Sequence, residues 1–185
     1  MLVYLGTSSN WSFTRRVLSL AHQHVHKEAL PTETLIFEGS SYDMGWDGSR
    51  TDPILENPVI PSLDHALYLI NTVRFRCGQL YHLFDETEFM RSVYDFYSDE
   101  SRSRTKSLWY IHFLLILAFG KSFVQQKRQE RKAPGMSYFI KALQILPDHS
   151  RLYTSPMIST EILCCIALFY QSLDCRSPAH NYVGC

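Results

Sequence analysis

Three histidines in one short stretch have the spacing that most resembles a metal site. His22 and His26 are four residues apart, with His24 between them, so on a helix the outer two would share a face and could hold one ion together. The acidic residue of an H-E-x-x-H motif is missing, and the sequence shows no obvious third ligand. We therefore interpret the histidines as the polar end of a helix, where imidazoles interact well with the helix dipole.

Two groups of carboxylates could also support chemistry. Asp43, Asp47 and Asp52 lie in a glycine-containing stretch that superficially resembles a calcium loop, but the ligand alternation and the closing Glu are missing. The acidic run from Asp85 to Glu88 could pair carboxylates for acid–base catalysis. Its spacing is also that of a capping box, with Asp85 as N-cap, and the helix dipole favours negative charge there. We expect turn chemistry in the first group and a helix start in the second.

The cysteines are odd in number and form no C-x-x-C pair, unlike a secreted disulfide framework. They are Cys77, Cys164, Cys165, Cys175 and Cys185. The adjacent pair at 164–165 could be a nucleophile or a redox pair. It lies in an apolar helical pattern without a positive neighbour that would stabilise a thiolate. We expect reduced, mostly buried and inert thiols in an intracellular protein.

The charge balance argues against a nucleic-acid surface. The chain has 18 Lys plus Arg and 18 Asp plus Glu, whereas domains that bind duplexes usually have a basic excess on one face. The basic stretch from Lys127 to Lys132 is mixed with Gln and Glu and is typical of a solvated helix end, as is the stretch 102–106. The sequence therefore predicts neither direct DNA contact nor binding to an anionic membrane.

No segment has the features of a membrane span or a signal peptide. The most apolar run, Leu108 to Phe119, is interrupted by His112 and is well short of the roughly 20 residues that cross a bilayer. The first residues lack the basic and apolar regions of a signal peptide. We expect the apolar run to form a buried central helix.

The elements that would position these residues are helices. Residues 12–28 have apolar residues at helical spacing, among them Val17, Leu20 and Val25. Residues 31–61 contain seven Pro and Gly residues and little periodicity, which predicts a long loop, with one short extended piece at Thr34 to Phe37. Residues 62–185 are expected to form the body of the domain.

Within that body, one helix follows Ser62, and a short one follows Asp85 with Phe89, Val93, Phe96 and Tyr97 on its buried face. Two more are expected at about 105–123 and 136–146, the former apolar around most of its circumference. Ser-Pro pairs at 155–156 and 177–178 predict two further helix starts. Six helix patterns and an incomplete last one, without a convincing strand pair, give an all-α fold. The last pattern stops at Cys185, so we expect an incomplete final helix and a domain, 1–185, truncated at its C-terminus.

Several short stretches occur in a fixed order along the whole chain. They are Tyr4 to Phe13 (YLGTSSNWSF), Tyr68-Leu69-Ile70, His82-Leu83-Phe84 followed by Glu88-Phe89, Tyr138-Phe139, Ile162 to Leu173, and Arg176 to Gly184. Their order and spacing resemble the fungal-specific regulatory domain, or middle homology region, of zinc-cluster transcription factors. That family reads DNA through a separate N-terminal cluster in which six cysteines hold zinc. No such array is present here, so the family's zinc ligands and base-contacting residues map to no position of this chain.

The resemblance implies a helical, nuclear regulatory module that binds protein partners of the transcription machinery or a small-molecule effector. It implies no catalytic, cofactor-binding or metal-binding residue in this chain, and DNA contact only through the absent zinc cluster. Two alternatives remain open: a helical small-molecule-binding or enzyme-like domain, and a generic helical adaptor. A pocket with convergent polar groups of perturbed ionisation would favour the former, and a concave surface of stacked helix pairs the latter.

Overall fold

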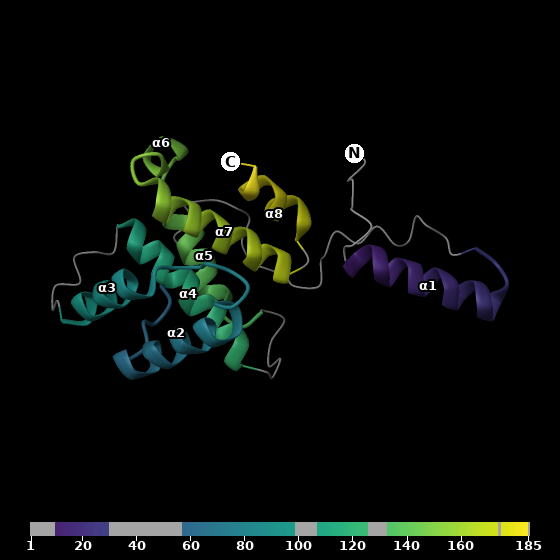
Figure 1. Ribbon diagram of the computed structural model, residues 1–185, viewed down its shortest axis with the longest axis horizontal. Coiled ribbons are helices and arrows are strands. Elements are labelled where there is room, and N and C mark those ends of the chain that lie inside the picture. The colour runs from purple at the N-terminus through teal and green to yellow at the C-terminus, as the bar shows by residue number, and fades with distance from the viewer. Residues whose placement is uncertain (1–9, 30–56, 99–106, 126–132, 174, 185) are drawn as a thin grey trace. The chain divides into compact units, whose positions relative to one another are not determined.

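The computed structural model describes residues 10–29, 57–98, 107–125, 133–173 and 175–184, and within them it is all-α, as predicted, without a strand. Its helices are α1 (Asn10–His26), α2 (Leu63–Cys77), α3 (Glu86–Ser98), α4 (Leu108–Val124), α5 (Met136–Ile145), α6 (His149–Leu152), α7 (Pro156–Ser172) and α8 (Arg176–Val183) (Figure 1). The short α6 was not predicted. The expected extended piece at 34–37 and most of the expected loop lie outside the described residues.

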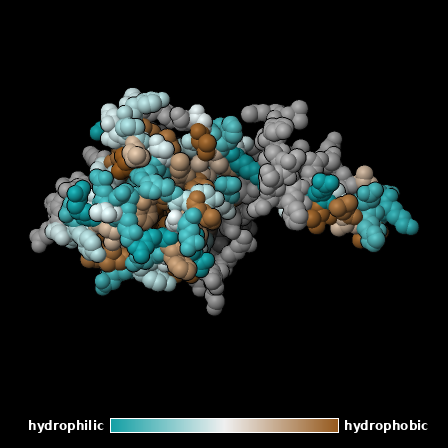
Figure 2. Space-filling view, viewed as in Figure 1, coloured by the Kyte–Doolittle hydropathy of each residue, from teal (hydrophilic) through white to brown (hydrophobic). Residues whose placement is uncertain are grey.

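The chain divides into two units, Met1–Glu38 and Gly39–Cys185, and α1 belongs to the first. The predicted helix at 12–28 is confirmed, beginning two residues earlier. Its apolar stripe, with Val17, Leu20 and Val25, is exposed to solvent, and apolar side chains gather on this helix in Figure 2. Lys27, with φ of 57°, adopts the left-handed conformation that commonly follows the end of a helix.

The second unit is built around α4, which is buried on all sides. Every residue from Tyr110 to Gly120 is buried, as the sequence predicted from its all-round apolar character. The helix begins later than expected, because the Ser107 hydroxyl accepts a hydrogen bond from the Tyr110 amide at 3.2 Å and caps it there. α2, α5 and α7 pack against α4, and α8 packs against α7 (Figure 1).

Two close backbone approaches bring helices against α4. A Cβ atom on Gly120 would lie 2.7 Å from Leu69 Cβ and 2.8 Å from Leu69 O, so only glycine lets α2 and α4 pack this closely. Gly135 has a φ of 82° and lies directly against the backbone of Ala118, where a side chain would collide with the Ala118 carbonyl. The turn into α5 therefore depends on glycine for both its conformation and its space.

The helix starts predicted from capping residues are only partly correct. At α3 the Asp85 carboxylate accepts from the Glu88 amide at 2.9 Å, as predicted. The Glu88 carboxylate, which a capping box would turn back toward the Asp85 amide, lies 3.7 Å from the guanidinium of Arg91. Phe89, Val93 and Phe96 are buried on this helix, as expected, whereas Tyr97 is only half-buried.

α7 begins at Pro156 as predicted, but the Ser155 side chain makes no cap hydrogen bond. α8 begins at Arg176, with Cys175 as N-cap, so Ser177 lies inside the helix and not at the predicted cap. Pro178 fits here because the first turn of a helix needs no amide donor from it.

The apolar run that forms α4 was predicted to be a buried helix. No helix of the described ranges is both long enough and apolar enough to cross a bilayer. Aromatic rings fill the contacts around α4: Phe139 of α5 stacks on Phe169 of α7 with centroids 4.2 Å apart.

Two tyrosine hydroxyls anchor the segment before α2 to the helical body. Tyr97 donates a hydrogen bond to Pro61 O and Tyr138 donates one to Val59 O, both at 2.8 Å.

The Gly120 crossing can be tested by adding one methyl group. Gly120→Ala should lower the free energy of unfolding by about 1–3 kcal/mol, because the new Cβ meets the Leu69 backbone and outweighs the helix propensity that alanine gains. Gly184→Ala is the matched control, since its Cβ would lie at an ordinary 3.5 Å from its nearest neighbour, the His180 carbonyl oxygen. Urea unfolding of both variants measures the difference; equal stabilities would show that the crossing tolerates a side chain.

Candidate functional site

A single backbone carbonyl anchors the segment that joins α2 to α3. α2 ends at Cys77, the chain runs without helix from residue 81 to 85, and Leu83 is buried in the middle of this segment. Nε2 of His112, on α4, lies 2.8 Å from the Leu83 carbonyl oxygen. Because a carbonyl can only accept, Nε2 must carry the hydrogen. The interaction therefore fixes both the position of the segment and the tautomer of His112.

The remaining nitrogen of His112 is a hydrogen-bond acceptor. The side chain is only 2% exposed, and burial lowers its pKa from 6.5 to about 4, with a smaller lowering from His82, while the hydrogen bond to Leu83 opposes the shift. Nδ1 thus keeps its lone pair near neutral pH. Among the described residues no hydrogen bond reaches Nδ1, although a carboxylate lies near it.

That carboxylate belongs to Glu161 of α7. Its Oε2 lies 3.8 Å from Nδ1 of His112, and its Oε1 lies 3.1 Å from Nε2 of His82. The side chain is 11% exposed, and desolvation raises its pKa, while the hydrogen bond and charge of His82 act in the opposite direction. Oε2 and Nδ1 are both acceptors when Glu161 is ionised, and they face each other without a direct hydrogen bond.

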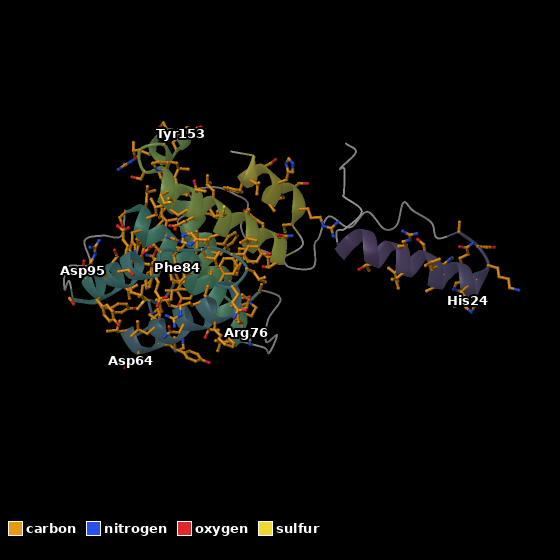
Figure 3. All side chains as sticks on the ribbon, in the orientation of Figure 1. His24, Asp64, Arg76, Phe84, Asp95 and Tyr153 are labelled. Carbon is orange, nitrogen blue, oxygen red and sulfur yellow. The ribbon has the colours of Figure 1, made fainter. Side chains whose placement is uncertain are left out.

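The pair opens on a cleft of about 410 Å³ between the starts of α3 and α7 and the first turns of α4. Its lining is Phe84, Asp85, Glu88, Phe89, Ser92, Trp109, His112, Ser155, Pro156, Met157, Ile158 and Glu161. The rings form one cluster: Phe84 and Phe89 have centroids 4.6 Å apart, and Phe89 meets His112 edge-on at 5.3 Å. Figure 3 labels Phe84 within this helical body.

Trp109 adds an unpaired donor to the same wall. Its ring stacks on Phe113 with centroids 5.2 Å apart, and its Nε1 is buried without a hydrogen-bond partner in the described part of the chain. A buried indole N–H normally finds an acceptor. The cleft therefore combines apolar rings with a carboxylate, an imidazole acceptor and a spare N–H donor, which is the composition of a small-molecule site.

Of the residues singled out from the sequence, Asp85 and Glu88 line this cleft, whereas the histidines lie elsewhere. His22 and His26 share a face of α1, with ring centroids 4.6 Å apart, and Nδ1 of His22 lies 3.2 Å from the Glu28 carbonyl. No group of three metal-binding side chains occurs in the described ranges. Asp43, Asp47 and Asp52, like the basic stretches, lie outside those ranges.

The expectation of mostly buried thiols is wrong for Cys164, and Cys77 and Cys175 are only half-buried. Cys165 is fully buried, and burial raises its pKa, with Cys164 and Glu161 adding to the shift, whereas Cys164 is exposed. Neighbouring residues on a helix point about 100° apart, so an adjacent pair rarely faces one core together. All four described cysteines are free thiols.

Sequence reasoning did not identify the two polar residues that face each other in the cleft, although each of them carried a detectable pattern. His112 is the one polar residue in an apolar run, and Glu161 is the one charged residue between Pro156 and Leu173. A polar group that must be buried requires a partner. The sequence pattern could have indicated that His112 and Glu161 each have a polar partner. It could not have indicated that these two residues lie next to each other.

Acid should destabilise the fold through His112. The pKa of His112 is 6.5 in the unfolded chain and about 4 in the folded protein. Between these two values the unfolded chain therefore binds a proton that the folded protein does not. Stability is therefore fully present above pH 6.5 and falls as the pH drops towards 4, by about 3 kcal/mol from this group. The raised pKa of Glu161 contributes in the opposite direction, since acid relieves the cost of burying its charge.

Urea unfolding of the wild type and of His112→Gln, from about pH 7 to about pH 4.5, isolates the effect. Gln can still donate to Leu83 but does not titrate. The stability gap between the two proteins should shrink on acidification, and a constant gap would contradict a neutral buried imidazole.

The two adjacent cysteines should react very differently. A maleimide should label Cys164 rapidly in the folded protein and leave Cys165 unmodified, because only the former is exposed and the thiolate of the latter is disfavoured. Mass spectrometry of Cys164→Ser and Cys165→Ser assigns the label. Loss of rapid labelling in Cys165→Ser alone would reverse the assignment.

Comparison with known proteins leaves the family open. No family model matches the chain, and no curated protein and no solved structure matches it either. The case for function therefore depends on the ordered sequence stretches and on the geometry described above.

Proposed function

We propose that this chain is a regulatory and interaction domain of a nuclear fungal transcription factor, controlling transcription by RNA polymerase II through binding without catalysing a reaction. The observation that carries the proposal is the ordered series of stretches from Tyr4 to Gly184 that resembles the middle homology region of zinc-cluster factors. A chance resemblance would explain any one stretch more easily than the whole order.

The positions of these stretches support the proposal. Leu69 lies at the glycine crossing with α4, and Leu83 receives the His112 hydrogen bond. Phe139 stacks on Phe169 at the contact of α5 with α7. The resembling stretches thus supply contacts on which the helical body depends, as expected for residues that define a common fold.

The proposed role requires partners beyond these residues. In the family, DNA is contacted through the zinc cluster, whose six-cysteine pattern maps to no position here. In this proposal the domain itself binds neither zinc nor DNA. It would bind proteins of the transcription machinery or a small effector. Its proposed location is the nucleus, and no membrane is involved.

A catalytic domain is the second candidate, because Glu161 and His112 both have perturbed pKa values in one cleft. The arrangement favours binding over catalysis. His112 uses its one hydrogen to hold Leu83, and the nearby Cys165 is kept as a thiol by burial, so the pair has no activated nucleophile to serve.

A tethering experiment tests the regulatory role. The chain, placed between a heterologous DNA-binding domain and an acidic activation domain, should change reporter output in a fungal cell by about fivefold, the scale of a typical regulatory coupling. The reference is a fusion with a flexible linker of equal length, and Gly120→Ala reports whether the effect needs a stable fold. Unchanged output at equal protein levels would contradict the proposal.

A further inference from the structure

We propose that the cleft between α3, α4 and α7 binds a small organic ammonium ion with an apolar body, its nitrogen placed between Oε2 of Glu161 and Nδ1 of His112. The inference deepens the proposed function, on which it rests only in treating the ligand as an effector.

At the polar end of the cleft, two hydrogen-bond acceptors face each other with no donor of the described residues between them. Oε2 and Nδ1 are 3.8 Å apart, too far for a direct hydrogen bond, and the bond from Nε2 to Leu83 leaves Nδ1 with only a lone pair. An ammonium nitrogen about 2.8 Å from each atom fits this separation and donates to both. A hydroxyl group has one hydrogen and could satisfy only one of the two.

The charges that line the cleft favour a cation. Asp85, Glu88 and Glu161 are all in the lining, and no Lys or Arg of the described ranges is. Asp85 is committed to capping α3, and Glu88 lies 3.7 Å from Arg91, so these two carboxylates have structural explanations. Glu161 pairs with the exposed His82 through Oε1 and accepts a backbone hydrogen bond from Asp85, yet its Oε2 still faces the acceptor Nδ1 of His112.

The apolar part of the cleft suits the body of such a ligand. Phe84, Phe89, Met157 and Ile158 offer rings and aliphatic surface on elements from both sides. Aromatic faces also attract cations, and a partly desolvated cleft strengthens that attraction. An organic amine would therefore be held at both ends, whereas an inorganic cation would leave the apolar walls unused.

The site can be tested on the full chain with three probes of one shape: tryptamine, neutral 3-ethylindole and anionic indole-3-propionate. Isothermal titration at neutral pH should show tryptamine binding about tenfold or more tightly than either analogue. Glu161→Gln should weaken tryptamine by about tenfold and leave 3-ethylindole unchanged. Glu86→Gln makes the same change at a carboxylate outside this cleft and should alter neither affinity.

Three outcomes would overturn the site: no binding of tryptamine, equal binding of all three probes, or wild-type affinity in Glu161→Gln with its fold intact by circular dichroism. The reporter fusion separates this result from the proposed function. Tryptamine binding without a change in reporter output would sustain the site and overturn the effector role. A reporter effect of the domain without tryptamine binding would overturn the site and leave the regulatory role supported.

Discussion

The complete burial of α4 is the constraint on which the rest of this structure depends. A helix that is apolar on every side must be surrounded, and α2, α5 and α7 do this. Each buried Leu, Ile or Phe contributes about 1.5–3 kcal/mol to stability, but the hydrophobic effect does not specify how the helices are oriented against one another. The glycines Gly120 and Gly135 set how closely the neighbouring segments approach, because a Cβ atom at either position would collide with Leu69 or Ala118.

A polar residue inside such a helix must be satisfied, and this requirement links the core to the cleft. His112 is buried with its Nε2 hydrogen on Leu83, which holds the segment between α2 and α3 in place. Since one nitrogen is used, the other is left as an acceptor beside Glu161. His112 thus stabilises the fold and also provides an acceptor in the cleft. Protonation of His112 would therefore affect both the stability of the fold and the chemistry of the cleft.

Local patterns predicted helices better than they predicted the roles of single residues. The apolar periodicity of α4, α5 and α7 is long enough to outweigh local ambiguity, so those helices were found. Caps were less certain, because Ser155 and Ser177 have the right chemistry for an N-cap but the helices begin without using it. Cys164 was misassigned because an apolar neighbourhood in sequence does not say which face of the helix a residue occupies.

The sequence by itself determined the all-α class, the central place of the most apolar helix and the capping of α3 by Asp85. These are consequences of periodicity and capping, which act within a few residues. Only the tertiary structure decided that His112, Glu161 and the rings of Phe84 and Phe89 share a cleft. The reason is that His112 and Glu161 meet through the packing of α7 on α4, and that packing is set by side-chain shape and glycine positions across the whole core.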